Sequence, residues 1–229
     1  MMKARKHSSF NWYEEVIRED FEVQEKYCVE VSNFIDKRYK KIREKIIEKL
    51  KNEEPESSDA IMKYHFDFNS DLPEIFHDTF LKSAFIISCG LFENYLREIS
   101  DLILEHHGIL KKIIEYKYSN SVLKKCKEKC LELYVNNIFI EFHSEWEIIE
   151  CCIFIRNKIV HSNSIFRNSD KCKLEKCNLN ISVSNYDNSH SRIVVISVDF
   201  VLAFNIACSK ILLKLVEEMV LKIQNEVTS

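Results

Sequence analysis

Apolar residues recur three or four positions apart, or at multiples of that spacing, between about Trp12 and Leu50, and charged residues separate them. This spacing has the period of an amphipathic α-helix and therefore predicts one long helix. Its apolar stripe consists of Val16, Val23, Tyr27, Val31, Phe34, Ile42, Ile46 and Leu50. The polar residues at 52–59, which include Pro55, follow the stripe and predict a linker.

A second long helix is predicted over the next apolar stretch. It begins near Ser70 or Asp71, with Pro73 in its first turn, where the N–H that proline lacks would be unpaired in any case. It ends around His107, because Gly108 then occupies the position at which helices commonly terminate.

The centre of the chain contains short helices and one strongly apolar helix. Residues 109–140 predict one or two shorter helices, interrupted by polar residues. Ser144 and Glu147 have the spacing of a capping box, in which each side chain bonds to the backbone N–H of the other residue at a helix start. An apolar helix is therefore expected from this pair to about His161, where polar residues end it.

The last part of the chain changes from the helical period to the strand period. Residues 178–184 alternate apolar and polar side chains, residues 192–198 are rich in β-branched residues, and a polar turn at 185–191 separates them. This arrangement predicts a β-hairpin. Asp199 is expected to cap a final helix over residues 200–224.

Together these elements predict an all-α fold: an up-and-down bundle of four to six helices with a small β-hairpin before the last helix. Residues 1–69 supply the long N-terminal helix and the polar linker, and residues 70–229 supply the main helical domain, within one compact unit. The chain has 229 residues, 46% of them hydrophobic and 30% charged, as in one soluble globular domain. No run approaches the ~20 uninterrupted apolar residues of a membrane span, so we expect a soluble protein.

Composition narrows the range of functions. Nine cysteines in a chain that begins without an apolar export segment predict reduced thiols in the cytoplasm. A net charge of −3 gives no overall attraction to nucleic acid, so an RNA site would depend on a local cluster of Lys and Arg. Only two glycines are present, which argues against the glycine-rich loops of nucleotide-binding proteins.

One charged residue lies where an apolar residue is expected. Projection of residues 147–161 on an ideal helix, at ~100° per residue, places Arg156 in the middle of the apolar arc. A guanidinium is rarely tolerated there unless a carboxylate or an anionic ligand compensates for its lost hydration. Helix geometry therefore leaves two explanations, a structural arginine paired with a buried acid and a functional arginine. Asn157 and His161 lie on the polar arc, where a solvated surface role is the alternative to a functional one.

Residues 156–161, with the sequence RNKIVH, are similar to the motif of HEPN ribonucleases, in which an arginine is followed directly by a polar residue and, four to six residues later, by a histidine. The apolar helix before this motif, which contains Trp146, also resembles that family. So do residues 91–98, LFENYLRE, which look like the phenylalanine-glutamate-x-tyrosine-leucine pattern of bacterial HEPN proteins linked to phage defence. The resemblance covers residues 80 to about 217, and residues 1–69 carry no motif.

The resemblance implies a metal-independent endoribonuclease that needs no cofactor, in which the ribose 2′-hydroxyl attacks the adjacent phosphate. His161 would exchange protons near neutral pH, and Arg156 would stabilise the charge on the phosphate. Asn157 would hold the histidine ring or a phosphate oxygen, and the alternative is an ordinary polar residue at a helix end. Glu93, at the margin of the apolar stripe of its helix, is the candidate partner of Arg156, and the alternative is a solvated surface acid.

Arg156 and His161 are about 140° apart on an ideal helix, too far for both side chains to point straight at one phosphate. Either the arginine curls around the helix or two protomers complete one site, and the resemblance favours a homodimer with a composite active site. RNA is then the substrate of a toxin or antiphage effector, and an antitoxin or another defence protein is an expected class of partner. Some HEPN toxins carry a tyrosine two residues after the histidine, which a partner nucleotidyltransferase modifies. Here that position is Asn163, which argues against this kind of neutralisation.

Two other interpretations stay open at this point. Cys126, Cys130, Cys172 and Cys177 could bind zinc, although their spacings fit structural zinc sites poorly, and buried thiols are the alternative. A helical domain of this kind could also be a non-catalytic dimerisation or interaction module in which Arg156 serves the core, because a fold does not dictate a function.

Overall fold

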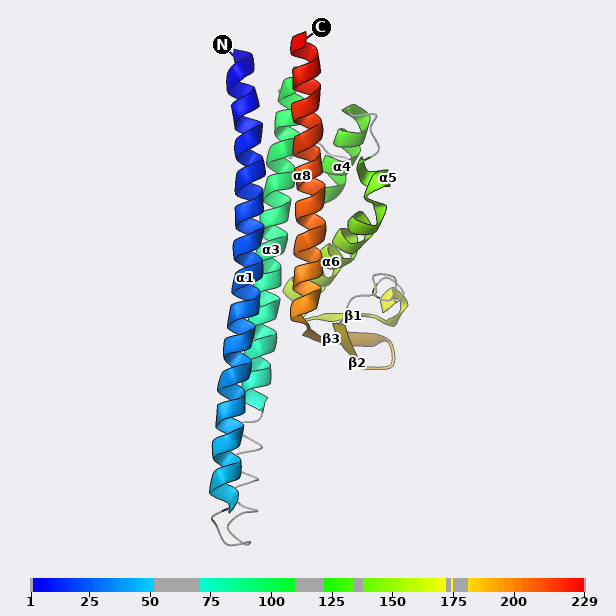
Figure 1. The fold of residues 1–229 in the computed structure, drawn as a ribbon. Helices are drawn as coiled ribbons and strands as arrows, with labels where there is room; N and C mark the ends of the chain where they lie inside the picture. The colour runs from blue at the N-terminus through cyan, green and yellow to red at the C-terminus, as the bar shows by residue number, and fades with distance from the viewer. Residues whose placement is uncertain are drawn as a thin grey trace.

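A computed structural model shows a bundle of long helices with a small sheet beside it (Figure 1). The structure describes residues 2–51, 71–109, 122–133, 138–171, 174 and 181–228. The helices are α1 (Met2–Lys51), α3 (Asp71–His106), α4 (Val122–Leu133), α5 (Ile138–Glu141), α6 (His143–His161) and α8 (Val198–Thr228). The strands are β1 (Ile165–Arg167), β2 (Ile181–Asn185) and β3 (His190–Ile196), and a short 3₁₀ turn, Asn168–Asp170, follows β1.

Successive long helices run in opposite directions. In Figure 1, α1 descends from the N-terminus, α3 ascends beside it, α6 descends obliquely on the far side of α8 from α1, and α8 ascends to the C-terminus. α1, α3 and α8 contact one another, and α6 contacts both α3 and α8. The predicted mostly helical fold, with a small antiparallel sheet before the last helix, is confirmed.

Aromatic side chains of α3 and α8 form the centre of the core. The ring centroid of Phe85 lies 4.9 Å from that of Phe200 and 5.4 Å from that of Phe204. Phe92 lies 6.3 Å from Phe204, and all four rings are buried. Edge-to-face ring pairs of this kind stabilise a fold beyond the area they bury, so α3 and α8 form the packed pair against which α1 and α6 lie.

α1 buries a different face from the one that its apolar period predicts. The side chains that enter the core are Ile17, Phe21 and Cys28. Part of the predicted stripe is exposed instead, namely Val23 (64%), Tyr27 (49%) and Phe34 (66%). The two faces are roughly 120° apart on the helix, and both satisfy the same period. The period alone therefore cannot decide which face meets the rest of the chain.

The predicted helix ends are right for the two helices that carry the motifs. α3 covers the predicted range and is followed by Gly108, which has a φ of +73°. α6 ends at His161. α1 begins at Met2, earlier than the prediction near Trp12. The interruptions expected within residues 109–140 fall outside the described residues, and α4 and α5 occupy the described part of that range.

The two predicted helix caps are wrong. α6 begins one residue before Ser144, so this side chain lies inside the first turn and donates to Glu145 rather than forming a capping box with Glu147. Asp199 lies inside the first turn of α8, which begins one residue earlier. Ser197 caps this helix, because its Oγ accepts a backbone N–H of the first turn at 3.1 Å.

α3 is long and apolar enough, by length and composition, to cross a membrane between Ile75 and His106. In the structure it is the central helix of the bundle and contacts α1, α4, α6 and α8. Leu81, Phe92 and Ile103 are among the side chains that it buries against these neighbours. Its place in the core accounts for its apolar composition.

β3 lies in the middle of a three-stranded antiparallel sheet with the order β1-β3-β2. β2 and β3 form the predicted hairpin, with an irregular register between Ser182 and Val183. β1 adds a strand that the sequence pattern does not predict, because three residues are too few to show a period. Ile193 of β3 donates its backbone N–H to the carbonyl of Ser164 at 2.9 Å, which ties the sheet to the chain leaving α6.

Candidate active site

α6 is held in place by its apolar face. The Trp146 ring packs edge-on against Phe139 of α5, with 4.6 Å between the centroids. The buried side chains of the helix are Trp146, Ile149, Cys151, Cys152, Ile153 and Ile155. Arg156 follows directly after Ile155, so its side chain leaves the helix beside the core, as its place on the apolar arc predicts.

The guanidinium of Arg156 is paired with the carboxylate that the sequence suggests. Its Nη2 lies 2.5 Å from Oε1 of Glu93 on α3. The two side chains keep 19% and 29% of their surface exposed. The ion pair therefore lies at the edge of the core, and the arginine is neither sealed inside the bundle nor free in solvent.

Buried thiols lie next to this ion pair. Cys89, one helical turn before Glu93 on α3, lies beside Arg156. Burial raises the pKa of the Cys89 thiol, the charge of Arg156 lowers it and Glu93 raises it again. Burial also raises the pKa of Cys208 well above its usual value, and Cys89 and Cys152 add to that effect. These thiols stay protonated near neutral pH, so the charged partner of the arginine is Glu93.

The arginine keeps donors for a further acceptor. A guanidinium carries five N–H groups in a planar fork. The hydrogen bond to Glu93 uses one of them. A phosphate oxygen could therefore bind to the exposed part of Arg156 while Glu93 stays in place.

His161 is exposed and is the last residue of α6. The helix is closed behind it by two bonds to the carbonyl of Lys158, from the N–H of Ser162 at 3.1 Å and of Ser164 at 2.8 Å. Asn163 and Ser164 have positive φ values of 48° and 66°, a left-handed conformation that costs energy for serine. Ser164 is buried and bonded to β3, so the backbone next to His161 is fixed rather than frayed.

The structure does not bring Arg156 and His161 together within one chain. α6 is continuous from His143 to His161, so the two side chains leave it about 140° apart and about 7.5 Å apart along the axis. Among the described residues, no hydrogen bond or ion pair joins them. The curled arginine considered from the sequence is not observed, since its Nη2 is held by Glu93.

Asn157 is exposed and lines a hollow of about 500 Å³ between α4 and α6. The other lining residues are Leu123, Lys124, Lys127, Glu128, Trp146, Glu150, Ile153 and Phe154. Lys127 lies over the Trp146 ring at 4.8 Å from its centroid, and its Nζ is 3.3 Å from Glu150. Asn157 therefore faces this hollow, one turn before His161, and in the part of the chain described here it makes no bond to the histidine.

Two exposed arginines that no sequence motif marks lie on the strands that follow His161. Arg192 of β3 is paired in register with Ile165, which lies four residues after the histidine. Arg167 of β1 is paired with His190, and both arginines are exposed. Their alternation with buried neighbours along the strands is the signal that would have found them, once the third strand is known.

His190 is engaged within its own turn. Its Nδ1 lies 3.0 Å from Oδ2 of Asp187 and 2.8 Å from Oγ of Ser189. Backbone and side-chain bonds from Ser189 and His190 lower the pKa of Asp187 to about 2. This histidine serves the hairpin turn, and His161 is the better candidate for proton exchange.

A metal centre has no support in the described part of the chain. No group of three or more His, Cys, Asp or Glu side chains is placed to hold an ion there. Cys126 is buried, but the side chains of Cys130, Cys172 and Cys177 lie outside the described residues. The zinc interpretation is therefore tested for one of its four cysteines only.

Comparisons with protein-family models, with curated proteins and with solved structures found no match. The interpretation of the site consequently rests on its residues and their geometry.

Proposed function

We propose that this protein is a HEPN-type, metal-independent endoribonuclease that acts in the cytoplasm as a toxin or antiphage effector. One observation carries the proposal. Arg156 is held at the edge of the core by Glu93, with 19% of its side chain exposed, on the same helix whose last residue is the exposed His161. An arginine can stabilise the charge on a phosphate and a histidine can exchange its protons, so the two residue types suit phosphodiester cleavage without a metal.

The chemistry is transfer of the phosphate to the neighbouring ribose oxygen. The 2′-oxygen forms a bond to phosphorus while its proton passes to a base, and the bond from phosphorus to the 5′-oxygen breaks as that oxygen takes up a proton. The imidazole of His161 serves as base or acid, because histidine is the side-chain type best suited to proton exchange near neutral pH. The guanidinium of Arg156 stabilises the negative charge of the pentacoordinate phosphate.

Neighbouring residues position the reacting groups and the RNA. Glu93 holds the plane of the Arg156 fork, so that the unused donors point to one acceptor position. Asn157, at the rim of the hollow between α4 and α6, contacts the nucleotide beside the scissile phosphate. Arg192 and Arg167 on the sheet bind the RNA backbone, as exposed basic residues do in proteins whose net charge is not basic.

A second copy completes the site in this proposal. The 140° separation on one helix is overcome when two motif helices face one cleft and each supplies its Arg156 or its His161. Mixing two inactive variants tests this directly. If the site is composite, Arg156→Met and His161→Ala chains together recover about a quarter of the wild-type rate, because half of the dimers are mixed and each has one intact site.

The decisive experiment is RNA cleavage by purified wild-type and His161→Ala proteins in the presence of EDTA. We expect the wild type to cleave despite chelation and the variant to lose roughly 100-fold or more of the rate. His143→Ala is the matched control, because His143 is another exposed histidine of α6, at its opposite end. Equal rates for wild type and His161→Ala, or cleavage that EDTA abolishes, would refute the proposal.

A second candidate function is a non-catalytic interaction module. The observation in its favour is the close Arg156–Glu93 pair, which a purely structural arginine would also make. Absence of cleavage by the wild-type protein on structured and unstructured RNA would favour this candidate.

A further inference from the structure

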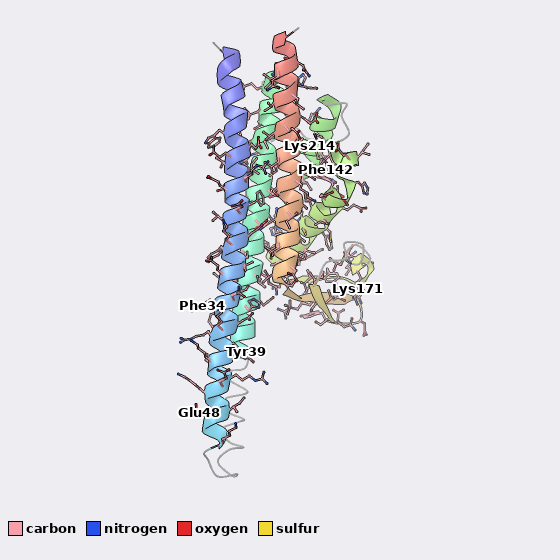
Figure 2. All side chains as sticks on the ribbon, in the orientation of Figure 1. Phe34, Tyr39, Glu48, Phe142, Lys171 and Lys214 are labelled. Atoms are coloured by element: carbon pink, nitrogen blue, oxygen red, sulfur yellow. The ribbon has the colours of Figure 1, made fainter. Side chains whose placement is uncertain are left out.

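α1 and α3 share an exposed apolar surface on the side away from the core. We name it the α1–α3 apolar face. Its members are Val23 (64% exposed), Tyr27 (49%), Phe34 (66%), Phe76 (64%), Ile87 (57%) and the partly buried Phe80. Figure 2 shows Phe34 on the lower half of α1, beyond the level at which α8 begins.

The helical spacing makes this surface continuous. Val23, Tyr27 and Phe34 are separated by four and seven positions and fall on one narrow stripe of α1. The stripes of the two helices meet where the Tyr27 ring lies 5.5 Å from that of Phe80.

Two hydrogen bonds fix how the antiparallel helices are aligned. Ser32 bonds to His77 at 3.0 Å, and Gln24 bonds to the carbonyl of Ala84 at 3.2 Å. This alignment sets Phe34 near the level of Phe76 and Val23 near that of Ile87. The pair of Tyr27 and Phe80 lies between these two levels. The face therefore consists of three successive layers of apolar side chains across two helices.

The exposed area of the face falls within the size range of apolar patches that often serve as binding sites. At 150–250 Å² per aromatic side chain, the exposed parts of its three most exposed rings alone amount to roughly 350 Å². The largest apolar patch of a typical monomer covers about 300–600 Å² and is often a binding site. The core of the subunit does not need this face, because α1 buries Ile17, Phe21 and Cys28 instead.

The charges of α1 indicate what covers the face. Residues 14–30 contain seven acidic and two basic side chains, whereas residues 37–51 contain eight basic and two acidic side chains. The apolar stripe at 23–34 lies between the two halves, with its centre near residue 28. A second α1 placed antiparallel about that centre sets residues 14–19, with three acidic and one basic side chain, beside residues 37–42 of the other copy, with four basic side chains, whereas a parallel one sets like charges together.

Individual residues agree with this register. A two-fold axis near residue 28 places Glu15 beside Lys41 and Glu19 beside Lys37 of the other copy. All four side chains are exposed, and in the described part of the chain none makes an ion pair within its own subunit. They are therefore available for pairs between two copies.

We infer that two copies of this chain associate through the α1–α3 apolar face, antiparallel about a two-fold axis, into a four-helix bundle of two α1 and two α3 helices. This contact differs from the composite cleft of the proposed nuclease. α6 packs on α3 and α8, and Glu93 lies roughly 110° around α3 from the apolar face. The two motif helices do not meet across this interface, so the inference and the proposed function can fail separately.

The test is the mass of the full chain in solution, measured by sedimentation equilibrium over a range of concentrations. We expect the wild type to self-associate, as a dimer through this face alone or as a larger assembly if the composite cleft also forms, and we expect a dissociation constant for this contact at least roughly tenfold higher for Phe34→Glu and for Phe76→Glu. Ile140→Glu is the matched control, because Ile140 on α5 is 66% exposed, as Phe34 is, but lies off the face. Far-ultraviolet circular dichroism checks that every variant is folded. A wild-type monomer at all concentrations, or a dimer that Phe34→Glu and Phe76→Glu leave unchanged, would overturn the inference.

Charge reversal tests the orientation. One variant carries Glu15→Lys with Glu19→Lys, and the other carries Lys37→Glu with Lys41→Glu. Each alone places like charges across the axis and is expected to dimerise more weakly than the wild type. A mixture of the two restores opposite charges and is expected to form a mixed dimer. Variants that dimerise as well alone as in the mixture would contradict the antiparallel register.

Discussion

The pairing of Arg156 with Glu93 offers the sharpest test of whether the arginine is structural or catalytic. Glu93→Gln keeps an acceptor oxygen but removes the charge, so the guanidinium loses its compensating carboxylate. Arg156→Met removes the opposite charge and leaves the carboxylate unpaired. The double variant removes both charges and leaves two neutral side chains of similar length.

The exposure of the pair sets the magnitude of each effect. Breaking a fully buried pair costs about 3–5 kcal/mol, and breaking an exposed pair costs about 0–1 kcal/mol. With 19% and 29% of the two side chains exposed, we expect each single variant to lose about 2 kcal/mol of unfolding free energy. For a chain of 229 residues this lowers the Tm by roughly 4–8 °C. The double variant should lose less than the sum of the single effects.

The assay combines urea denaturation with RNA cleavage at a temperature where all three variants are folded. If Arg156 stabilises the transition state, the double variant recovers stability but not cleavage. Glu93→Gln alone keeps part of the activity, because the guanidinium is still present but less well positioned. The catalytic interpretation is refuted if the double variant cleaves RNA at the wild-type rate, since the arginine would then serve the fold alone.

Three further outcomes follow from the structure. Phe204→Ala should cost about 3–5 kcal/mol in urea denaturation, whereas Ile206→Ala, at a 47% exposed position on the same helix, should stay within about 0.5 kcal/mol. Burial and a hydrogen bond to Glu98 raise the pKa of Tyr13 from 10.0 to about 12, so its stabilisation is present below pH 10 and is lost as the pH rises through about 12. Tyr13→Phe should remove that decline from alkaline denaturation curves, and an unchanged curve would contradict the linkage. In a protein that also carries His161→Ala, Arg192→Gln should weaken RNA binding. It should also reduce, by about 1, the slope of the logarithm of the binding constant against the logarithm of the salt concentration. An unchanged slope would exclude a phosphate contact.

Much of the fold could be predicted from local patterns, because its elements are long and regular. Gly108 marks the end of α3, and the alternation of β2 and β3 marks a hairpin. The caps could not be predicted, because a serine or an aspartate near a helix start fits several registers that differ by one residue. β1 could not be found either, because its pairing with β3 depends on the tight turn after α6 rather than on its own three residues.

The ion pair of the candidate site could be predicted, because a charge that leaves water needs a compensating charge beside it. Arg156 on an apolar arc requires an acid, and Glu93 at the edge of another apolar stripe is such an acid. The distance between Arg156 and His161 was predictable too, because a continuous helix fixes it. Arg192 was not predictable, since its position near the motif arises from strand register, which a single sequence does not reveal.

The use of arginine rather than lysine follows from the position of the pair. A lysine ammonium is a compact charge, and a carboxylate at short distance would largely neutralise it. Few donors in a fixed direction would then remain for a second anion. The guanidinium of Arg156 can hold Glu93 with one side of its fork and present the other donors in a fixed plane. The adjoining Cys89 is a protonated thiol, so it adds no negative charge that would compete with a phosphate at the proposed site. Glu93 thus compensates for the lost hydration of Arg156 in the free protein. It leaves some of the guanidinium N–H donors for a second acceptor.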